Sequence, residues 1–191
     1  MQKLNKIEFY FIWSVYYNIL QYLVMSITFS NINKEETKFE SSVKKANTVW
    51  SESFGNEYGE GECNGDSLAI GCIDGKPVCA GIMEIWGNIA LISCIGSSPQ
   101  KCGHGSLLML YIIKHLKASN ITKIYLKIDK DEKADRLEKF YRRYGFVKDE
   151  VGEEDVLFDY DPYLDLDLEY VMSCDLNLDL DLDFKNLQIV S

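Results

Sequence analysis

The sequence has only two histidines, His104 and His115, and no two of its six cysteines have C-x-x-C spacing. Structural zinc sites are built from closely spaced Cys and His pairs, so the sequence predicts no metal site. Most of the cysteines lie in apolar or motif stretches, where a free thiol behaves as a small buried hydrophobe. This usage favours a reducing, cytoplasmic environment over a secreted, disulfide-bonded one.

Basic residues are also scarce. Lys and Arg number 20 against 30 Asp and Glu, which leaves a formal net charge of -10 at pH 7. A protein of this charge repels polyanions and attracts cations over long range. Nucleic acid is therefore not an expected partner, whereas a basic partner is.

Charged residues are absent from one long stretch, Phe9 to Phe29. As a helix it would be about 31 Å long, close to the roughly 30 Å hydrocarbon thickness of a bilayer. Against a membrane anchor, Ser14, Asn18 and Gln21 fall on one helical face, and no small-residue cleavage site marks a signal peptide. The anchor stays open, but we favour a hydrophobic extension whose last part, Leu23 to Phe29, is the first strand of the fold.

With 191 residues, 47% of them hydrophobic, the chain can bury one sizeable core. We predict a single domain over residues 23–176. It follows the hydrophobic extension of residues 1–22 and precedes an acidic tail, residues 177–191, in which leucine alternates with aspartate. The tail is interpreted as a low-complexity segment, with a cation-attracting flank as the alternative.

The hydrophobic periodicity predicts alternating helices and strands. Between Asn33 and Phe54, apolar residues at helical spacing predict one amphipathic helix, and Asp74-Gly75 is a strong hairpin signal. The expected strands are Asp66 to Ile73, Lys76 to Trp86, Ala90 to Ile95, Lys123 to Ile128, and two closing strands within Val147 to Tyr160 and Leu168 to Leu176. A helix over Ser106 to Lys117 and a second one ending near Phe140 complete the pattern.

The stretch from Ala90 to Tyr111 organises the chain as strand, loop and helix. Gly103 and Gly105 stand where the helix begins. Glycine lets the backbone approach a ligand closely, and the N–H groups and dipole of a helix N-terminus attract anionic oxygens. The stretch lacks the third glycine of a Rossmann fingerprint and the Gly-Lys-Ser/Thr of a Walker loop. A diphosphate cradle of another kind is one interpretation, and a loosened tight turn is the other.

The string Gln-x-x-Gly-x-Gly over Gln100 to Gly105 resembles the acetyl-coenzyme A loop of the GNAT superfamily of N-acetyltransferases. A second string, Phe140-Tyr141-Arg142-Arg143-Tyr144-Gly145-Phe146, resembles the second signature of that family, at the family's spacing. The two motifs and the elements around them cover roughly residues 66–174. The resemblance implies an α/β fold in which a mixed, splayed central sheet is flanked by helices. It also implies acetyl-CoA as the cosubstrate.

The resemblance further implies which residues bind the coenzyme. The backbone of Ser93, Cys94 and Ile95 would pair with the pantetheine arm, and an N–H near Ser93 would polarise the thioester carbonyl. Main-chain N–H groups of the loop would hold the diphosphate, with added charge from Lys101. The loop residues are Gln100, Lys101, Cys102, Gly103, His104, Gly105 and Ser106. Cys102 and His104 occupy variable positions, and their side chains are expected to point away from the phosphates.

For catalysis, the resemblance places Tyr141 as the general acid, since a phenol stays protonated at neutral pH and can donate to a leaving thiolate. A core aromatic is the alternative role. Glu84 is the best-placed carboxylate for a general base, which an alkyl ammonium acceptor requires. The predicted activity is acetyl transfer to a primary amine of a basic acceptor: a protein lysine or N-terminus, or a polyamine-like amine. The alternative is a non-catalytic acyl-CoA-binding protein of the same fold.

Overall fold

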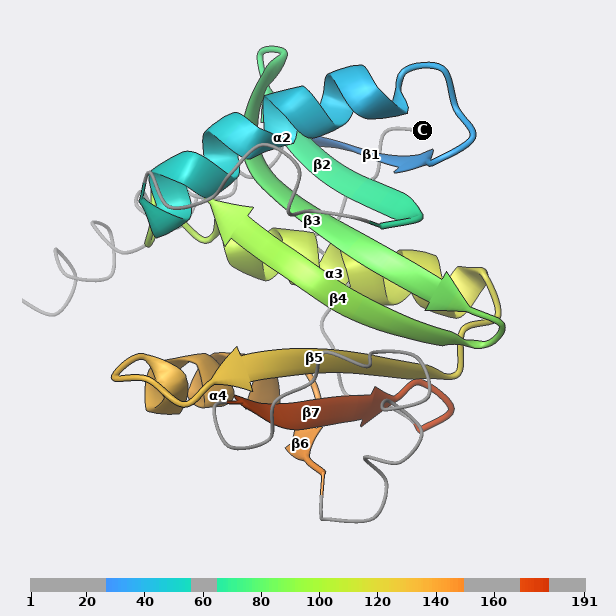
Figure 1. The fold of residues 1–191 in the computed structure, drawn as a ribbon, viewed down its shortest axis with the longest axis vertical. Coiled ribbons are helices and arrows are strands. Elements are labelled where there is room, and N and C mark those ends of the chain that lie inside the picture. Colours follow the sequence, from blue (N-terminus) through green and yellow to red (C-terminus); the bar gives the residue numbers. More distant parts are fainter. Residues whose placement is uncertain (1–26, 56–64, 150–168, 179–191) are drawn as a thin grey trace, which may run out of the picture.

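The fold is described from a computed structural model, over residues 27–55, 65–149 and 169–178. Within this part of the chain, seven strands form one mixed sheet in the order β1-β2-β3-β4-β5-β7-β6. The strands are β1 (Ile27–Asn33), β2 (Ser67–Ile73), β3 (Lys76–Trp86), β4 (Ile89–Ser97), β5 (Lys123–Asp129), β6 (Val147–Lys148) and β7 (Glu169–Asp175). The helices are α2 (Phe39–Phe54), α3 (His104–Ala118) and α4 (Ala134–Arg142). Figure 1 shows the sheet with its strands labelled.

Strands β1 to β4 form an antiparallel meander, and β4 then pairs in parallel with β5. The β2–β3 hairpin turns at Asp74 and Gly75, whose φ values are 50° and 76°. Two successive positive φ values match the right-handed twist of the strands, and this is the geometry that the Asp-Gly pair predicts. The parallel step from β4 to β5 is made through α3, as parallel strands require a crossover.

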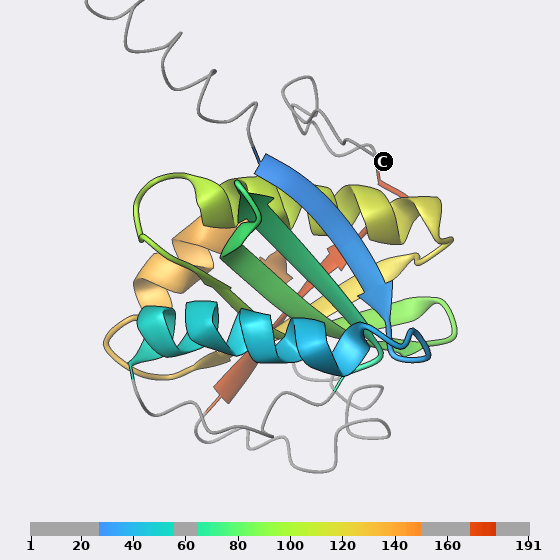
Figure 2. The same cartoon turned by 90° about the horizontal axis from the view of Figure 1, so that it is seen from above.

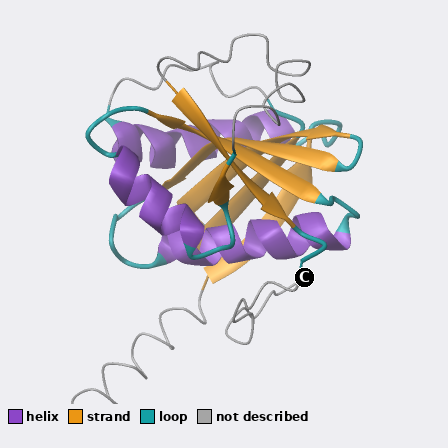
Figure 3. Cartoon of the chain, turned by 90° about the horizontal axis from the view of Figure 1, so that it is seen from below, coloured by secondary structure: helices purple, strands orange, loops and turns teal. Residues whose placement is uncertain are grey.

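Helices cover both faces of the sheet. Seen from above and from below, α2 and α3 lie on opposite sides of the strands (Figures 2 and 3). On the α2 face, the fully buried Trp50 packs with Leu68 and Ile82, and its Nε1 donates to the Ala80 carbonyl (3.0 Å). On the other face, α3 and α4 share one core cluster with β4 and β5. The predicted splayed α/β sheet flanked by helices is confirmed.

The structure corrects several predicted boundaries. β1 runs to Asn33, past the expected end at Phe29, because Ile27, Phe29 and Ile32 are buried in the core. The predicted helix between Asn33 and Phe54 begins only at Phe39, after a turn. The closing strand predicted within Leu168 to Leu176 is β7, which ends at Asp175. Of the strand sought in Val147 to Tyr160, the described part is β6 alone.

Other predictions fall on residues that the structure does not describe. The apolar stretch Phe9 to Phe29 and the strand start at Leu23 lie mostly outside the described residues. So do most of the acidic tail and the predicted domain boundary between residues 22 and 23. Within the described ranges, no helix has both the length and the apolar character needed to cross a bilayer.

Candidate functional site

The sheet opens between β4 and β5. These two strands are paired only from Ile89↔Lys123 to Ile92↔Leu126. Beyond that point β4 continues to Ser97, and β5 continues to Asp129 paired with β7 on its other side. The backbone of β4 after Ile92 therefore has one side without a neighbouring strand in the described sheet. An extended ligand can take that place.

A β-bulge lies where the split begins. Ile82 of β3 pairs with Cys94, but the next residue, Met83, pairs with Ile92, so Ser93 is an extra residue in β4. A bulge leaves its extra residue out of the regular ladder and bends the strand. Ser93 therefore has no partner residue in the β3–β4 ladder. This is the position at which the sequence predicted a donor for a thioester carbonyl.

The loop after β4 delivers the N-terminus of α3 to the same split. Gly103 has φ 83° and precedes the first helical residue, His104. The Gly103 carbonyl already accepts the N–H groups of Ser106 (3.0 Å) and Leu107 (3.1 Å). The N–H groups that precede Ser106 have no acceptor one turn back, as at any helix start, and carry the positive end of the dipole. This geometry suits an anionic ligand.

The C-terminal turn of α2 holds this loop in place. The Gln100 Nε2 donates to the Ser53 carbonyl (3.0 Å), and the Ser53 hydroxyl donates to the Ser97 carbonyl (2.9 Å). Gly96 fits closely against α2, since a Cβ there would lie 2.9 Å from Trp50 Cδ1. The side chain of Gln100 is therefore committed to positioning the loop, and its role in the site is structural.

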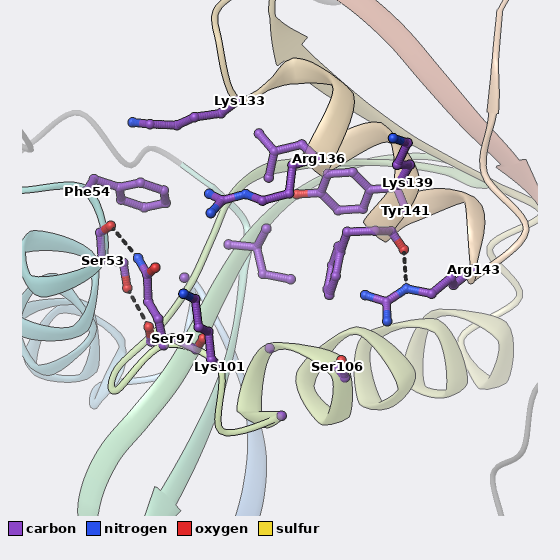
Figure 4. A pocket seen from close by; sticks show the side chains of 17 residues that line it. Ser53, Phe54, Ser97, Lys101, Ser106, Lys133, Arg136, Lys139, Tyr141 and Arg143 are labelled. Carbon is purple, nitrogen blue, oxygen red and sulfur yellow. Dashed lines mark hydrogen bonds between the residues drawn. The ribbon is translucent and has the colours of Figure 1, made fainter.

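A cavity of about 970 Å³ occupies the split. It is lined by the end of α2, by β4 and its loop, by the start of α3 and by α4 (Figure 4). Five cationic residues line it, and no Asp or Glu is among its described lining residues. The cationic residues are Lys101, Lys133, Arg136, Lys139 and Arg143. In a chain with net charge -10 this is a strong local reversal of sign. The cavity is built for an anion.

Tyr141 reaches this cavity from α4, and Figure 4 shows its ring directed into it. The residue is only 7% exposed, and burial raises the pKa of its phenol above the ordinary 10.0, with a smaller contribution from the nearby Cys94 of β4. Phe140 lies edge-on to the ring at 5.1 Å, and Phe146 lies at 5.9 Å. Tyr141 is thus a protonated hydroxyl held by aromatic packing beside the split.

Glu84 lies on β3 and contacts Ser93, the first residue of β4 beyond its last pair with β5. It is partly buried in β3, and its Oε1 accepts a hydrogen bond from the Ser93 hydroxyl at 2.6 Å. Ile82, two residues earlier on the same strand, packs in the α2 core, so Glu84 projects from the α2 face of the sheet. Tyr141 belongs to the core on the α3 and α4 face. The two predicted catalytic groups approach the split from opposite faces.

The predicted site residues divide into two groups. Those that line the cavity are Ile95, Gln100, Lys101, Gly103, Gly105, Ser106 and Tyr141. Ser93, Cys94 and Glu84 flank the split without lining the cavity. Cys102 is exposed, and neither Cys102 nor His104 lines the cavity. Burial lowers the pKa of His104, whose Nδ1 is buried with no hydrogen-bond partner in the described structure.

The contributions of α2 and α4 to the cavity were not predicted from the sequence. Ser53 and Phe54 line it from α2, and Phe54 is 42% exposed there. Four of the five cationic lining residues come from α4 and the residues that flank it on either side, Lys133 and Arg143. A signal was present, because Lys133, Arg136, Lys139 and Arg143 recur at spacings of three and four, which places them along one side of a helix.

The model of the acetyltransferase (GNAT) family matches residues 32–146 of the chain. The matched range holds the split, the loop, α3 and α4, and it spans more than half of the chain. The protein therefore belongs to the GNAT family of acetyltransferases. A comparison with curated protein sequences gives no match.

Solved structures of the same fold include several acetyltransferases. GCN5 from Tetrahymena superposes with a TM-score of 0.60 at 13% identity, over 78% of this chain and 95% of that one. The ribosomal-protein-S18-alanine N-acetyltransferase from Escherichia coli gives 0.57 at 16% identity, over 81% and 97%. PaiA N-acetyltransferase from Thermoplasma acidophilum, solved with coenzyme A, gives 0.51 at 13% identity, over 78% and 99%. At these identities the likeness shows the shared fold. Family membership supports acetyl transfer from an acyl-CoA as the general activity.

Proposed function

We propose that this protein is an acetyl-CoA-dependent N-acetyltransferase that acts on a primary amine of a basic acceptor. The observation that carries the proposal is the cationic cavity at the split between β4 and β5, with the N-terminus of α3 at its wall. A coenzyme with a diphosphate and a further phosphate carries the charge that such a cavity attracts. An extended pantetheine arm is the kind of ligand that an unpaired strand side can hydrogen-bond.

Within the site, the proposed coenzyme contacts follow the chain. The backbone of Ser93, Cys94 and Ile95 pairs with the pantetheine arm along the open side of β4. The loop from Gln100 to Ser106 holds the diphosphate through main-chain N–H groups, chiefly those before Ser106, whose own N–H is engaged by Gly103. Lys101 adds charge from the same loop. Bound acetyl-CoA supplies the activated thioester.

Three groups of the chain then have defined tasks. The N–H of Ser93 at the bulge donates to the thioester oxygen and stabilises the charge that develops there. Tyr141 gives its proton to the leaving thiolate. Glu84 takes up a proton from the acceptor, because an alkyl ammonium of pKa about 10.4 is almost wholly protonated at neutral pH and cannot attack in that form. In the balanced reaction the amine gains an acetyl group, and the thiolate leaves as the free thiol.

We propose a chemical class of acceptor and no single compound. The net charge of -10 favours a basic one, such as a protein lysine or N-terminus or a polyamine-like amine. We propose a cytoplasmic location from the cysteine usage, and a catalytic domain over residues 23–176.

Two measurements on the full chain test the proposal. Acetyl-CoA at 100 times its dissociation constant should stabilise the fold by about 2.7 kcal/mol, visible as a rise in Tm. Mass spectrometry of a panel of protein N-termini, lysine peptides, polyamines and aminoglycosides should then detect an acetylated product. No thermal shift at millimolar acetyl-CoA would overturn the coenzyme assignment. A shift without product across the panel would instead favour the non-catalytic acyl-CoA-binding alternative.

A further inference from the structure

We infer that the hydroxyl of Ser93 is a catalytic proton relay, which passes the acceptor's proton to Glu84. The inference rests on the proposed function, and it assigns to the Ser93 side chain a task separate from that of its backbone. Glu84 then acts through Ser93, and the two residues form one proton-accepting unit.

Ser93 lies closer to the split than Glu84 does. Ser93 is on β4, the strand that borders the split, whereas Glu84 is on β3, one strand farther in. Neighbouring strands are about 4.8 Å apart, so a carboxylate on β3 is set back from a reacting group in the split by about that distance. Glu84 pairs across the ladder with Leu91, before the split opens. A group that attacks a thioester in the split therefore meets Ser93 first.

The bulge in β4 determines the face on which the Ser93 side chain lies. Ser93 is the extra residue between Cys94 and Ile92, which pair with consecutive residues of β3. Leu91 shares its apolar cluster with Trp86, on the face from which Glu84 projects, and Cys94 packs in the α2 core on that same face. The bulge sets the Ser93 side chain on this face as well, where its hydroxyl meets Glu84. Without the extra residue, the register would not bring a β4 side chain to Glu84 at the mouth of the split.

The hydrogen bond between Ser93 and Glu84 has a defined direction. A carboxylate can only accept, so the Ser93 hydroxyl donates to Glu84 Oε1, at a distance of 2.6 Å. The short distance is that of a charge-assisted O–H···O⁻ bond. With its own proton directed at Glu84, the Ser93 oxygen presents its lone pairs elsewhere. It is then ready to accept a proton from an ammonium group that lies in the split.

The transfer balances. As the acceptor ammonium loses its proton to the Ser93 oxygen, the Ser93 hydroxyl proton moves to Glu84, which becomes a neutral carboxylic acid. The amine is left with a free electron pair, which forms the bond to the thioester carbon as the carbon–sulfur bond breaks. Tyr141 protonates the departing thiolate from the opposite face. The new amide nitrogen then gives up its second proton, which restores the Tyr141 phenol, and Glu84 returns its proton to solvent, so no further reactant is needed.

A set of variants separates this relay from a merely structural hydrogen bond. The variants are Ser93→Ala, Ser93→Thr, Glu84→Gln and the Ser93→Ala/Glu84→Gln double variant. The matched control is Ser173→Ala in β7, which also removes a serine hydroxyl from a carboxylate, that of Asp149, away from the split. Each protein is assayed in single turnover with acetyl-CoA and the fastest acceptor of the panel named above. Its Kd for CoA and its Tm are measured alongside.

The relay predicts that Ser93→Ala and Glu84→Gln each lower kcat by about 10², the lower range for a lost acid–base group. The double variant should be no slower than either single one, because both changes break one pathway. Ser93→Thr keeps a hydroxyl and should recover most of the rate. The Kd for CoA should stay near that of the wild type in all four, since the backbone of β4 is unchanged. Ser173→Ala should lower Tm and leave kcat unchanged.

Three results would overturn the relay: wild-type kcat in Ser93→Ala, a double variant whose loss is the product of the single losses, or a Ser93→Thr variant as slow as Ser93→Ala. The two proposals fail in different ways. A wild-type protein that acetylates no member of the panel overturns the proposed function, and the relay falls with it. An active wild type with an equally active Ser93→Ala variant overturns the relay alone.

Discussion

Replacing Tyr141 with Phe should remove the proposed general acid and little else. The ring contacts with Phe140 at 5.1 Å and Phe146 at 5.9 Å do not involve the hydroxyl and would remain. The hydroxyl is directed into the cavity, so its loss leaves no buried partner unsatisfied. The free energy of unfolding should therefore change by less than about 1 kcal/mol.

The catalytic cost should be much larger. Burial raises the pKa of Tyr141, so its phenol is fully protonated across the neutral range. Loss of a positioned acid costs about 10² to 10⁴ in rate, or about 3 to 5 kcal/mol.

The assay is single-turnover formation of free CoA thiol, which isolates the chemical step from product release. Tyr144→Phe is the matched control, because Tyr144 is also a buried tyrosine packed on Phe140 but does not line the cavity. Tyr141→Phe should lower kcat while its Kd for CoA stays near that of the wild type. Tyr144→Phe should keep the wild-type rate. Equal rates for the two variants would return Tyr141 to the role of a core aromatic.

Three further predictions follow from particular residues. In Gly103→Ala (φ 83°) and Gly75→Ala (φ 76°) the new Cβ meets no atom within 4 Å, so each variant should lose only about 1 kcal/mol of stability through backbone strain. Only Gly103→Ala should also weaken CoA binding, measured by calorimetry. Arg136→Glu should weaken CoA binding about tenfold and flatten its salt dependence, whereas Lys114→Glu, on an exposed part of α3 outside the cavity, should do neither. Because folding raises the pKa of Tyr141, the phenol ionises at lower pH in the unfolded chain than in the folded protein. Above about pH 10, the free energy of unfolding of the wild type should therefore fall by about 1.4 kcal/mol per pH unit relative to that of Tyr141→Phe, measured in denaturant titrations. An unchanged difference between pH 9 and 11 would contradict that burial.

Local signals predicted the elements of this fold well. Asp74-Gly75 specifies its own turn, and the apolar periods of β3, β5 and α3 are long enough to be read from the chain alone. The two glycines of the loop likewise marked the start of α3. Each of these features depends on residues close together in sequence, so one segment carries the whole signal.

Features that depend on pairing between distant segments were not predicted. The bulge at Ser93 is a property of the β3–β4 register, and nothing in the composition of β4 marks it. The tie between Gln100 and Ser53 joins residues 47 positions apart, which no local pattern indicates. The sequence predicted only a main-chain contribution of Gln100 to the coenzyme loop, and the anchoring of its side chain to α2 was not predicted.

The split in the sheet would let one thioester be served by the proposed acid and the proposed base, which lie on opposite faces. In a fully paired sheet, the backbone and its ladder separate side chains on the two faces, and no small reacting group touches both. Here the ladder between β4 and β5 ends at Ile92, so Tyr141 lines the cavity at this opening and Ser93 is the next residue of β4 beyond the last pair. Acyl transfer passes through a tetrahedral intermediate in which the nucleophile and the leaving group occupy different corners. A base and an acid can therefore reach the two groups from the two faces that meet at the split.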